Sequence, residues 1–178
     1  MHIMLTRPFE DIKDLIIKFK SLGHMVSHLP VIKINEVDVE KLNYSNFSGV
    51  IFTSANSAKF LDTKKIDKSI YCFCVGTVTE SQVLKKGFQN VYAADGNVEN
   101  LKEIIIQNFD KKNGKLLYVS GEIISSDLHK QLIDQDFQVD RIVNYSVEHI
   151  KDFDQKFINE LKKSMPDIIY VYSKNSAK

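Results

Sequence analysis

The chain has 178 residues, of which 43% are apolar and 26% charged, and its 24 basic and 23 acidic side chains give a formal net charge of +1. This composition is that of a globular protein and excludes a disordered, collagen-like or coiled-coil chain. The near-zero charge argues against a nucleic-acid partner. No apolar run approaches the ~20 residues that span a bilayer, and the N-terminus is no signal peptide, so we expect a cytoplasmic protein without a membrane partner.

Short apolar runs alternate with amphipathic segments along the whole chain, which predicts an α/β protein with mostly parallel sheets. The predicted strands cover 2–6, 24–29, 49–53, 70–75, 90–93, 115–120, 138–145 and 167–172. The first predicted helix begins near Pro8 and is closed by Gly23. The other predicted helices cover 55–61, 77–86, 98–108, 124–135 and 153–164.

Two segments, 30–38 and 139–150, carry β-branched residues with polar ones between them and no turn or helix signal, so we expect extended crossings. Because they bracket a block of strands and helices, they predict two lobes, with the chain leaving the first lobe and later returning to it. An internal repeat supports paired lobes: segments 51–59 and 170–178 share five of nine residues, and each runs from an apolar strand into Ser-x-Asn-Ser-Ala. The second copy ends the sequence, so we expect an incomplete first lobe.

Cys72 and Cys74 are the only cysteines and lie two residues apart in a predicted strand, so both should face one side as buried, unbridged thiols. A Cys-x-Cys pair without further ligands is no zinc signature, and His24 and His28 would lie ~13 Å apart along an extended strand. We therefore predict no metal site.

Hydroxyl side chains follow the C-terminal ends of the predicted strands, the edge at which open α/β sheets bind ligands. They are Thr6, Thr53, Ser54, Thr77, Thr79, Ser120 and Ser173. Taken singly, each is better explained as a helix N-cap. Taken together on one edge of two lobes, they favour a site for a polyanionic small molecule, to which Arg7 adds a fixed positive charge.

Several short motifs follow one another along the chain: LTRP at 5–8, FTSANSA at 52–58, VGTVT at 75–79 followed by Gly87, GNVENL at 96–101, and Tyr145. In this order and spacing, they resemble the uroporphyrinogen-III synthase family over the whole length of the chain. Members of this family close hydroxymethylbilane, a linear octacarboxylate, into the asymmetric macrocycle of the haem pathway without a cofactor. The resemblance implies two flavodoxin-like lobes, each a parallel sheet flanked by helices, joined by a two-stranded linker with the substrate between them.

The resemblance also implies boundaries and roles. The first lobe would comprise 1–34 plus 147–178 and the inserted lobe 38–142, with 35–37 and 143–146 as linkers. Tyr145 matches the family tyrosine proposed to help the substrate hydroxyl depart, although interlobe packing explains a tyrosine there equally well. Ser54 and Thr79 match positions at the family's cleft. The predicted substrate-binding residues are Thr6, Arg7, Ser54, Ala55, Asn56, Thr77, Thr79, Ser120 and Ser173.

The sequence departs from the family in two places. Segment 122–128, after Gly121, lacks the arginine that family members often carry there, and the family continues beyond Ala177 through further strands and helices. We therefore expect this chain alone to be weakly active or inactive and to form oligomers through an exposed sheet edge. A full-length member is expected to be a monomer that transiently contacts the preceding pathway enzyme.

The alternative is a non-catalytic α/β module that binds a small molecule. A receiver-like domain should show paired acids after the first strand, where this chain has Thr6-Arg7-Pro8. A periplasmic sugar-binding protein would need an export signal.

Overall fold

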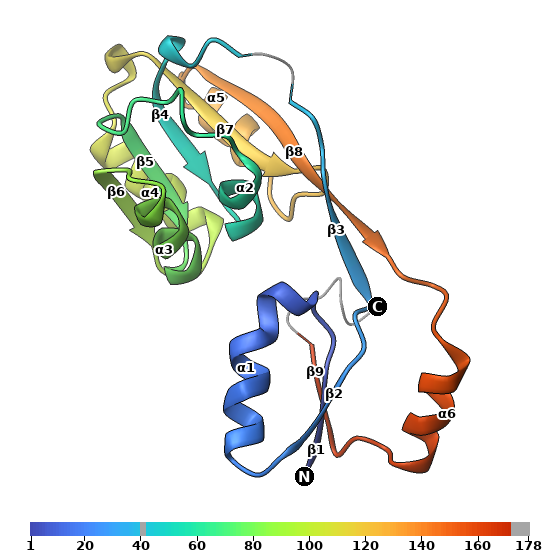
Figure 1. Ribbon diagram of the computed structural model, residues 1–178. Coiled ribbons are helices and arrows are strands. Elements are labelled where there is room, and N and C mark those ends of the chain that lie inside the picture. The colour runs from blue at the N-terminus through green and yellow to red at the C-terminus, as the bar shows by residue number, and fades with distance from the viewer. Residues whose placement is uncertain (40–41, 172–178) are drawn as a thin grey trace. The chain divides into compact units, whose positions relative to one another are not determined.

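The computed structural model describes residues 1–39 and 42–171. The chain divides into two compact units: unit 1 is Met1–Asn35 with Val147–Lys178, and unit 2 is Glu36–Ser146 (Figure 1). Unit 1 has a parallel sheet on which a helix packs, and the larger sheet is mostly parallel with helices packed on it, so the predicted α/β class is confirmed. Within the described residues, no helix has both the length and the apolar character needed to cross a membrane.

The larger sheet has six strands in the order β3-β8-β7-β4-β5-β6. Their bounds are Ile32–Glu36 for β3, Phe47–Phe52 for β4, Tyr71–Val75 for β5, Asn90–Ala94 for β6, Lys115–Gly121 for β7 and Val139–His149 for β8. All pairings from β8 to β6 are parallel. Their carboxyl ends therefore meet at one edge of the sheet, and this edge lies in unit 2.

Helices cover both faces of this sheet (Figure 1). They are α2 (Ala55–Phe60), α3 (Thr77–Lys85), α4 (Val98–Asn108) and α5 (Leu128–Ile133), with 3-10 turns η1 (Tyr44–Asn46) and η2 (Lys111–Asn113). Along β4 the buried side chains alternate: Val50 and Phe52 pack in the cluster that includes Ala58 of α2, and Ile51 packs in the cluster that includes Leu101 of α4. Burial on both faces explains why residues 50–52 of this strand form an unbroken apolar run.

The two expected extended crossings are strands β3 and β8, which are neighbours in the sheet. The backbone N–H of Val37 donates to the carbonyl of Asn144 at 3.0 Å, and that of Ile150 donates to the carbonyl of Val31 at 2.9 Å. From the first bond to the second, the residue number falls from 37 to 31 in one segment and rises from 144 to 150 in the other, so β3 and β8 run in opposite directions. Their hydrogen bonds satisfy the backbone of both segments that link the units.

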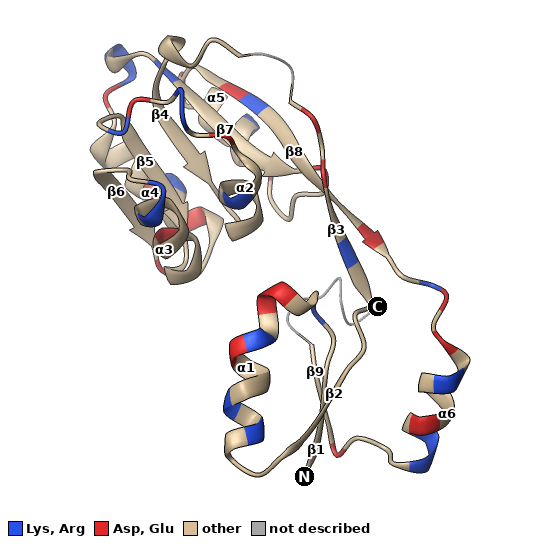
Figure 2. Cartoon of the chain, in the orientation of Figure 1, with Lys and Arg blue, Asp and Glu red and all other residues tan. Residues whose placement is uncertain are grey.

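In unit 1, β1 (His2–Leu5) lies between β2 (Met25–His28) and β9 (Ile168–Tyr170), and both pairings are parallel. Helix α1 (Phe9–Ser21) buries Ile12 against Ile3 and Leu5. Acidic residues begin α1 and basic residues end it, which complements the helix dipole (Figure 2). Gly23, with φ of +78°, follows the end of the helix, as predicted. The last helix is α6 (Gln155–Lys163).

Several predicted elements are wrong at their ends; the strand expected over 138–145, for example, continues to His149. The helix expected over 124–135 begins only at Leu128, because the Asp127 side chain caps it by accepting from the backbone N–H of Lys130 at 3.0 Å. The two serines before Asp127 compete for backbone hydrogen bonds and favour the loop. The last strand, expected over 167–172, is β9 and ends at Tyr170.

The cysteine prediction is confirmed. Cys72 and Cys74 are free, fully buried and members of the same core cluster. Burial raises the pKa of the Cys72 thiol strongly, and burial together with Glu80 raises the pKa of Cys74 to about 12. Both thiols are therefore neutral in the folded protein at pH values where an unfolded chain carries thiolates.

This difference predicts a stability change at alkaline pH. The unfolded chain releases thiol protons above pH ~9 while the folded chain keeps them, so the free energy of unfolding should fall as pH rises from 9 towards 12. Each thiol should change the unfolding equilibrium by up to about tenfold per pH unit. Urea unfolding over this range measures the effect.

The control for this experiment is the double variant Cys72→Ala and Cys74→Ala, which removes both thiols and should show a shallower pH dependence. Equal slopes for the two proteins would contradict the prediction.

Candidate functional site

A β-bulge marks the end of the pairing between β7 and β8. Ser120 pairs with Val143, and the next pair joins Gly121 to Tyr145, so Asn144 is an extra residue in β8. Such an insertion bends the strand and changes the direction of the side chains that follow it. The bulge lies at the carboxyl edge of the larger sheet.

Because of the bulge, two consecutive side chains reach α2. The Asn144 amide donates to the carbonyl of Ser57 at 2.8 Å, and the Tyr145 ring lies 6.4 Å from the ring of Phe60, measured between centroids. In a regular strand these neighbours would point to opposite faces. The bulge therefore delivers Tyr145 to the α2 side of the sheet.

The Tyr145 ring rests directly on Gly121. A Cβ atom on Gly121 would lie 2.6 Å from Cζ and 2.8 Å from the hydroxyl oxygen of Tyr145. The Tyr145 carbonyl also accepts from the backbone N–H of Glu122 at 3.0 Å, and only 9% of the residue is exposed. Only glycine allows this approach, so Gly121 determines where the phenol lies.

Arg141 is joined to the same end of β7. Its Nε–H donates to Ser120 Oγ at 2.8 Å, and its Nη2 donates to the carbonyls of Gly121 at 2.9 Å and Glu122 at 3.2 Å. Ser120 is fully buried, and its hydroxyl donates to the Gly121 carbonyl at 3.0 Å. The predicted site residue Ser120 therefore supports Arg141 and the chain turn after β7.

On the face of the sheet covered by α4 and α5, the buried phenol of Tyr118 hydrogen-bonds Thr53 at 3.1 Å, which joins the ends of β4 and β7. Burial raises the pKa of Tyr118. The phenol is thus a neutral structural link at neutral pH.

The predicted residues after β4 form the start of α2. Ser54 caps this helix, its Oγ accepting from the backbone N–H of Asn56 at 3.2 Å, while Ser57 Oγ donates to the Ser54 carbonyl at 2.7 Å. Ala55 and Asn56 are the first two residues of the helix. Ser54 therefore has the N-cap role that we expected for a single serine, and it also lies at the carboxyl edge of the sheet.

The predicted residues after β5 begin α3. Gly76, with φ of +79°, is the N-cap and supplies no side-chain acceptor. Thr77 is exposed, and Thr79 is 4% exposed. The first N–H groups of α3 therefore lack a side-chain cap from the capping residue.

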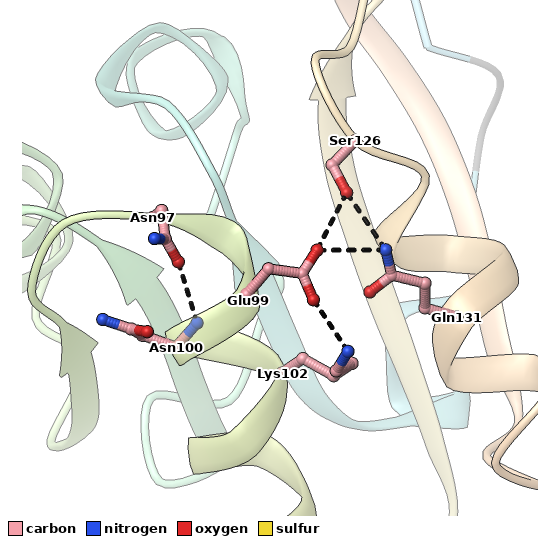
Figure 3. A network of polar contacts seen from close by, with 6 residues as sticks. All are labelled: Asn97, Glu99, Asn100, Lys102, Ser126 and Gln131. Atoms are coloured by element: carbon pink, nitrogen blue, oxygen red, sulfur yellow. Dashed lines mark hydrogen bonds and ion pairs between the residues drawn. The ribbon is translucent and has the colours of Figure 1, made fainter.

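A polar network holds α4 to α5 beside this edge (Figure 3). Glu99 accepts from Lys102 at 2.7 Å, Gln131 at 3.2 Å and Ser126 at 3.4 Å. Hydrogen bonding by Lys102 is the main cause that lowers the pKa of Glu99. Ser126 belongs to the loop that leaves Gly121, so the GNVENL segment steadies that loop.

Thr6 and Arg7 lie in unit 1, after β1. Thr6 is 2% exposed and its Oγ1 donates to the carbonyl of Tyr170 at 3.0 Å. Arg7 forms an ion pair with Asp11, with 3.4 Å between Nε and Oδ2. Ser173 lies outside the described residues.

The structure thus brings most predicted residues to one edge of unit 2. They are Ser54, Ala55, Asn56, Thr77, Thr79, Ser120 and Tyr145. Sequence reasoning missed Arg141 and Asn144. Arg141 could have been found from its place between Val139 and Val143 in an alternating strand, where a cation in an apolar row requires polar partners. Asn144 had no comparable signal.

Within residues 1–39 and 42–171, no three His, Cys, Asp or Glu side chains gather closely enough to hold a metal ion. The chemistry available at this edge is hydrogen bonding by hydroxyl, amide and backbone groups, together with one guanidinium.

Residues 13–178 match the family model described as "Uroporphyrinogen-III synthase HemD". Over 112 residues the chain is 28% identical to the uroporphyrinogen-III synthase of Saccharomyces cerevisiae, and this match covers 59% of the chain and 40% of the yeast protein. The chain thus spans less than half the length of this curated relative.

Two solved structures share the fold. The uroporphyrinogen-III synthetase of Helicobacter pylori has a TM-score of 0.66 at 18% identity, over 99% of this chain and 76% of that one. A mutant uroporphyrinogen III synthase of Thermus thermophilus has a TM-score of 0.60 at 11% identity, over 95% of this chain and 71% of that one. At these identities, the likeness is one of fold.

The contact between Gly121 and Tyr145 predicts the effect of Gly121→Ala. The added methyl group must displace the ring, so the variant should lose about 1–3 kcal/mol of stability, the usual cost of overpacking. Thermal or urea unfolding measures this loss.

A double-mutant cycle with Tyr145→Ala provides the control. Without the ring, Gly121→Ala should cost much less, because no left-handed backbone conformation requires glycine at this position. An undiminished cost in the Tyr145→Ala background would show that the ring is not the cause.

Proposed function

The chain belongs to the uroporphyrinogen-III synthase family, and from this premise we propose that it closes hydroxymethylbilane into uroporphyrinogen III as a cyclising lyase. The family model that matches residues 13–178 is the observation that carries this proposal. A non-catalytic α/β binding module is not favoured, because the curated relative is also a synthase.

The proposed reaction sets a geometric task. Loss of the terminal hydroxyl as water leaves an electron-poor azafulvene, which the far pyrrole ring attacks through its substituted carbon. The resulting spiro intermediate fragments and recloses with that ring inverted. Spontaneous closure gives the symmetric type I isomer. The protein must therefore hold both ends of a flexible octacarboxylate in the less accessible arrangement, a task for orientation rather than strong acid–base chemistry.

We assign Tyr145 the role of hydrogen-bond donor to the departing hydroxyl. The ring is seated on Gly121 and against Phe60, which limits the directions in which its hydroxyl can point. Phenols are weak acids at neutral pH, so a hydrogen bond that strengthens as the oxygen leaves suits this group better than full proton transfer.

The substrate carboxylates are assigned to the beginnings of α2 and α3. Ser54, Ala55 and Asn56 supply a hydroxyl and backbone N–H groups, and Thr77 and Thr79 do the same after β5. N–H groups at helix starts bind anions without requiring a basic surface. This agrees with the net charge of +1. Thr6 and Arg7 are proposed to contribute from unit 1.

Four further expectations stay predictions. They are the cytoplasmic location, the contact with the preceding pathway enzyme, the oligomeric state and the weak activity of this chain alone.

The direct test is to incubate the purified chain with hydroxymethylbilane, oxidise the products and separate type III from type I porphyrin. Type III product is expected to form at a low rate, and Tyr145→Phe should lower kcat by about 10²-fold with little change in KM, because the lost hydrogen bond acts mainly in the transition state. The measured rate also tests the expectation of weak activity.

Tyr92→Phe is the matched control, since it removes a phenol hydroxyl from β6, on the face of the sheet covered by α4. It should behave as the unmodified chain. Formation of type I isomer alone, at the rate seen without protein, would contradict the proposed function.

A further inference from the structure

We propose that Arg141 is a carboxylate-binding residue, and that its guanidinium receives one carboxylate of the polycarboxylate substrate at the carboxyl edge of the larger sheet. The position of the guanidinium is a structural observation. The identity of the ligand rests on the proposed function.

The guanidinium is held in a fixed orientation. Arg141 pairs with Tyr118 in the register of β7 and β8, yet its side chain extends along the sheet to Ser120, Gly121 and Glu122. Three hydrogen bonds of 2.8 to 3.2 Å hold it there. An arginine that is already ordered loses little conformational freedom when a ligand binds.

The charge of this guanidinium is not neutralised by its contacts. All three acceptors are uncharged oxygens, a hydroxyl and two carbonyls. Among the ion pairs of the described residues, Arg7, Lys102, Lys111, Lys115 and Lys130 each have a carboxylate partner, and Arg141 has none. A half-buried cation without a counter-ion attracts an anionic ligand more strongly than one in bulk water.

The guanidinium also has an unused edge. The hydrogen bonds within the described residues use Nε and Nη2, and none uses Nη1. Nη1 carries two N–H donors, which suit a carboxylate oxygen. Segment 122–128 contains neither lysine nor arginine, and Arg141 brings a positive charge to the end of β7 through its bonds to the Gly121 and Glu122 carbonyls.

The place of this charge fits the proposed reaction. Arg141 donates to the carbonyl of Gly121, and the Tyr145 ring rests on the same glycine. A carboxylate held by Arg141 would therefore anchor the substrate close to the phenol that we assign to the departing hydroxyl. Holding a flexible substrate near the reacting group is what selects the type III arrangement.

The test measures binding of uroporphyrin III, the oxidised macrocycle with the same eight carboxylates, by quenching of its fluorescence. Arg141→Gln should raise the dissociation constant about tenfold, the effect of losing one charge-assisted contact. The difference from the unmodified chain should shrink at high salt, which screens charge interactions. With hydroxymethylbilane, the same variant should raise KM and the fraction of type I product.

Lys115→Gln is the matched control, since it removes one positive charge from the same strand pair at the opposite end of β7, where Lys115 pairs with Asp140. It should leave the dissociation constant unchanged. Arg141→Lys keeps the charge and should bind uroporphyrin more tightly than Arg141→Gln. Melting temperatures of all variants establish that they are folded.

Three results would overturn the proposal: unchanged binding by Arg141→Gln, equal losses in Arg141→Gln and Arg141→Lys with lowered melting temperatures, or no binding by the unmodified chain. The first leaves the proposed function standing if type III product still forms. Conversely, Arg141→Gln could lose binding in a salt-sensitive way while the unmodified chain shows no turnover of hydroxymethylbilane. The loss of binding would then support the carboxylate site, and the lack of turnover would contradict the proposed activity.

Discussion

The extra residue in β8, opposite the end of β7, sets the geometry on which the rest of the site depends. With Asn144 inserted, the pair after Ser120 and Val143 is Gly121 with Tyr145. A regular pairing would send Tyr145 to the face opposite Asn144, away from α2. The Asn144 amide is bonded to Ser57 of α2, so the bulge is anchored from the helix as well as from the sheet.

The contacts around the bulge support one another because they share Gly121 and its neighbours. Gly121 offers its Cα to the Tyr145 ring and its carbonyl to both Ser120 and Arg141. Arg141 also binds the Glu122 carbonyl, and the Glu122 N–H binds the Tyr145 carbonyl. Backbone and side-chain bonds thus form one connected set, which keeps the phenol and the guanidinium in a fixed relation.

Sequence patterns predicted the elements well where local physics decides them. Alternating apolar and polar residues identified the crossings that became β3 and β8, and helical spacing closed by glycine identified α1. The predicted start of α5 was wrong because the Asp127 side chain caps the helix at Leu128, although the residues before Asp127 continue the apolar pattern. At the site, the strand-end positions of Ser54 and Thr79 were recognisable, since parallel strands place their carboxyl ends together.

By itself, the sequence determined the α/β class, the order of the elements, the common face of Cys72 and Cys74 and the edge at which the hydroxyl residues gather. These follow from periods of two and 3.6 residues and from local turn chemistry. Only the tertiary structure decided that Asn144 is inserted and that Arg141 lies beside Gly121. The reason is physical: a one-residue bulge is decided by pairing with β7, and the partner of Asn144 lies 87 residues away.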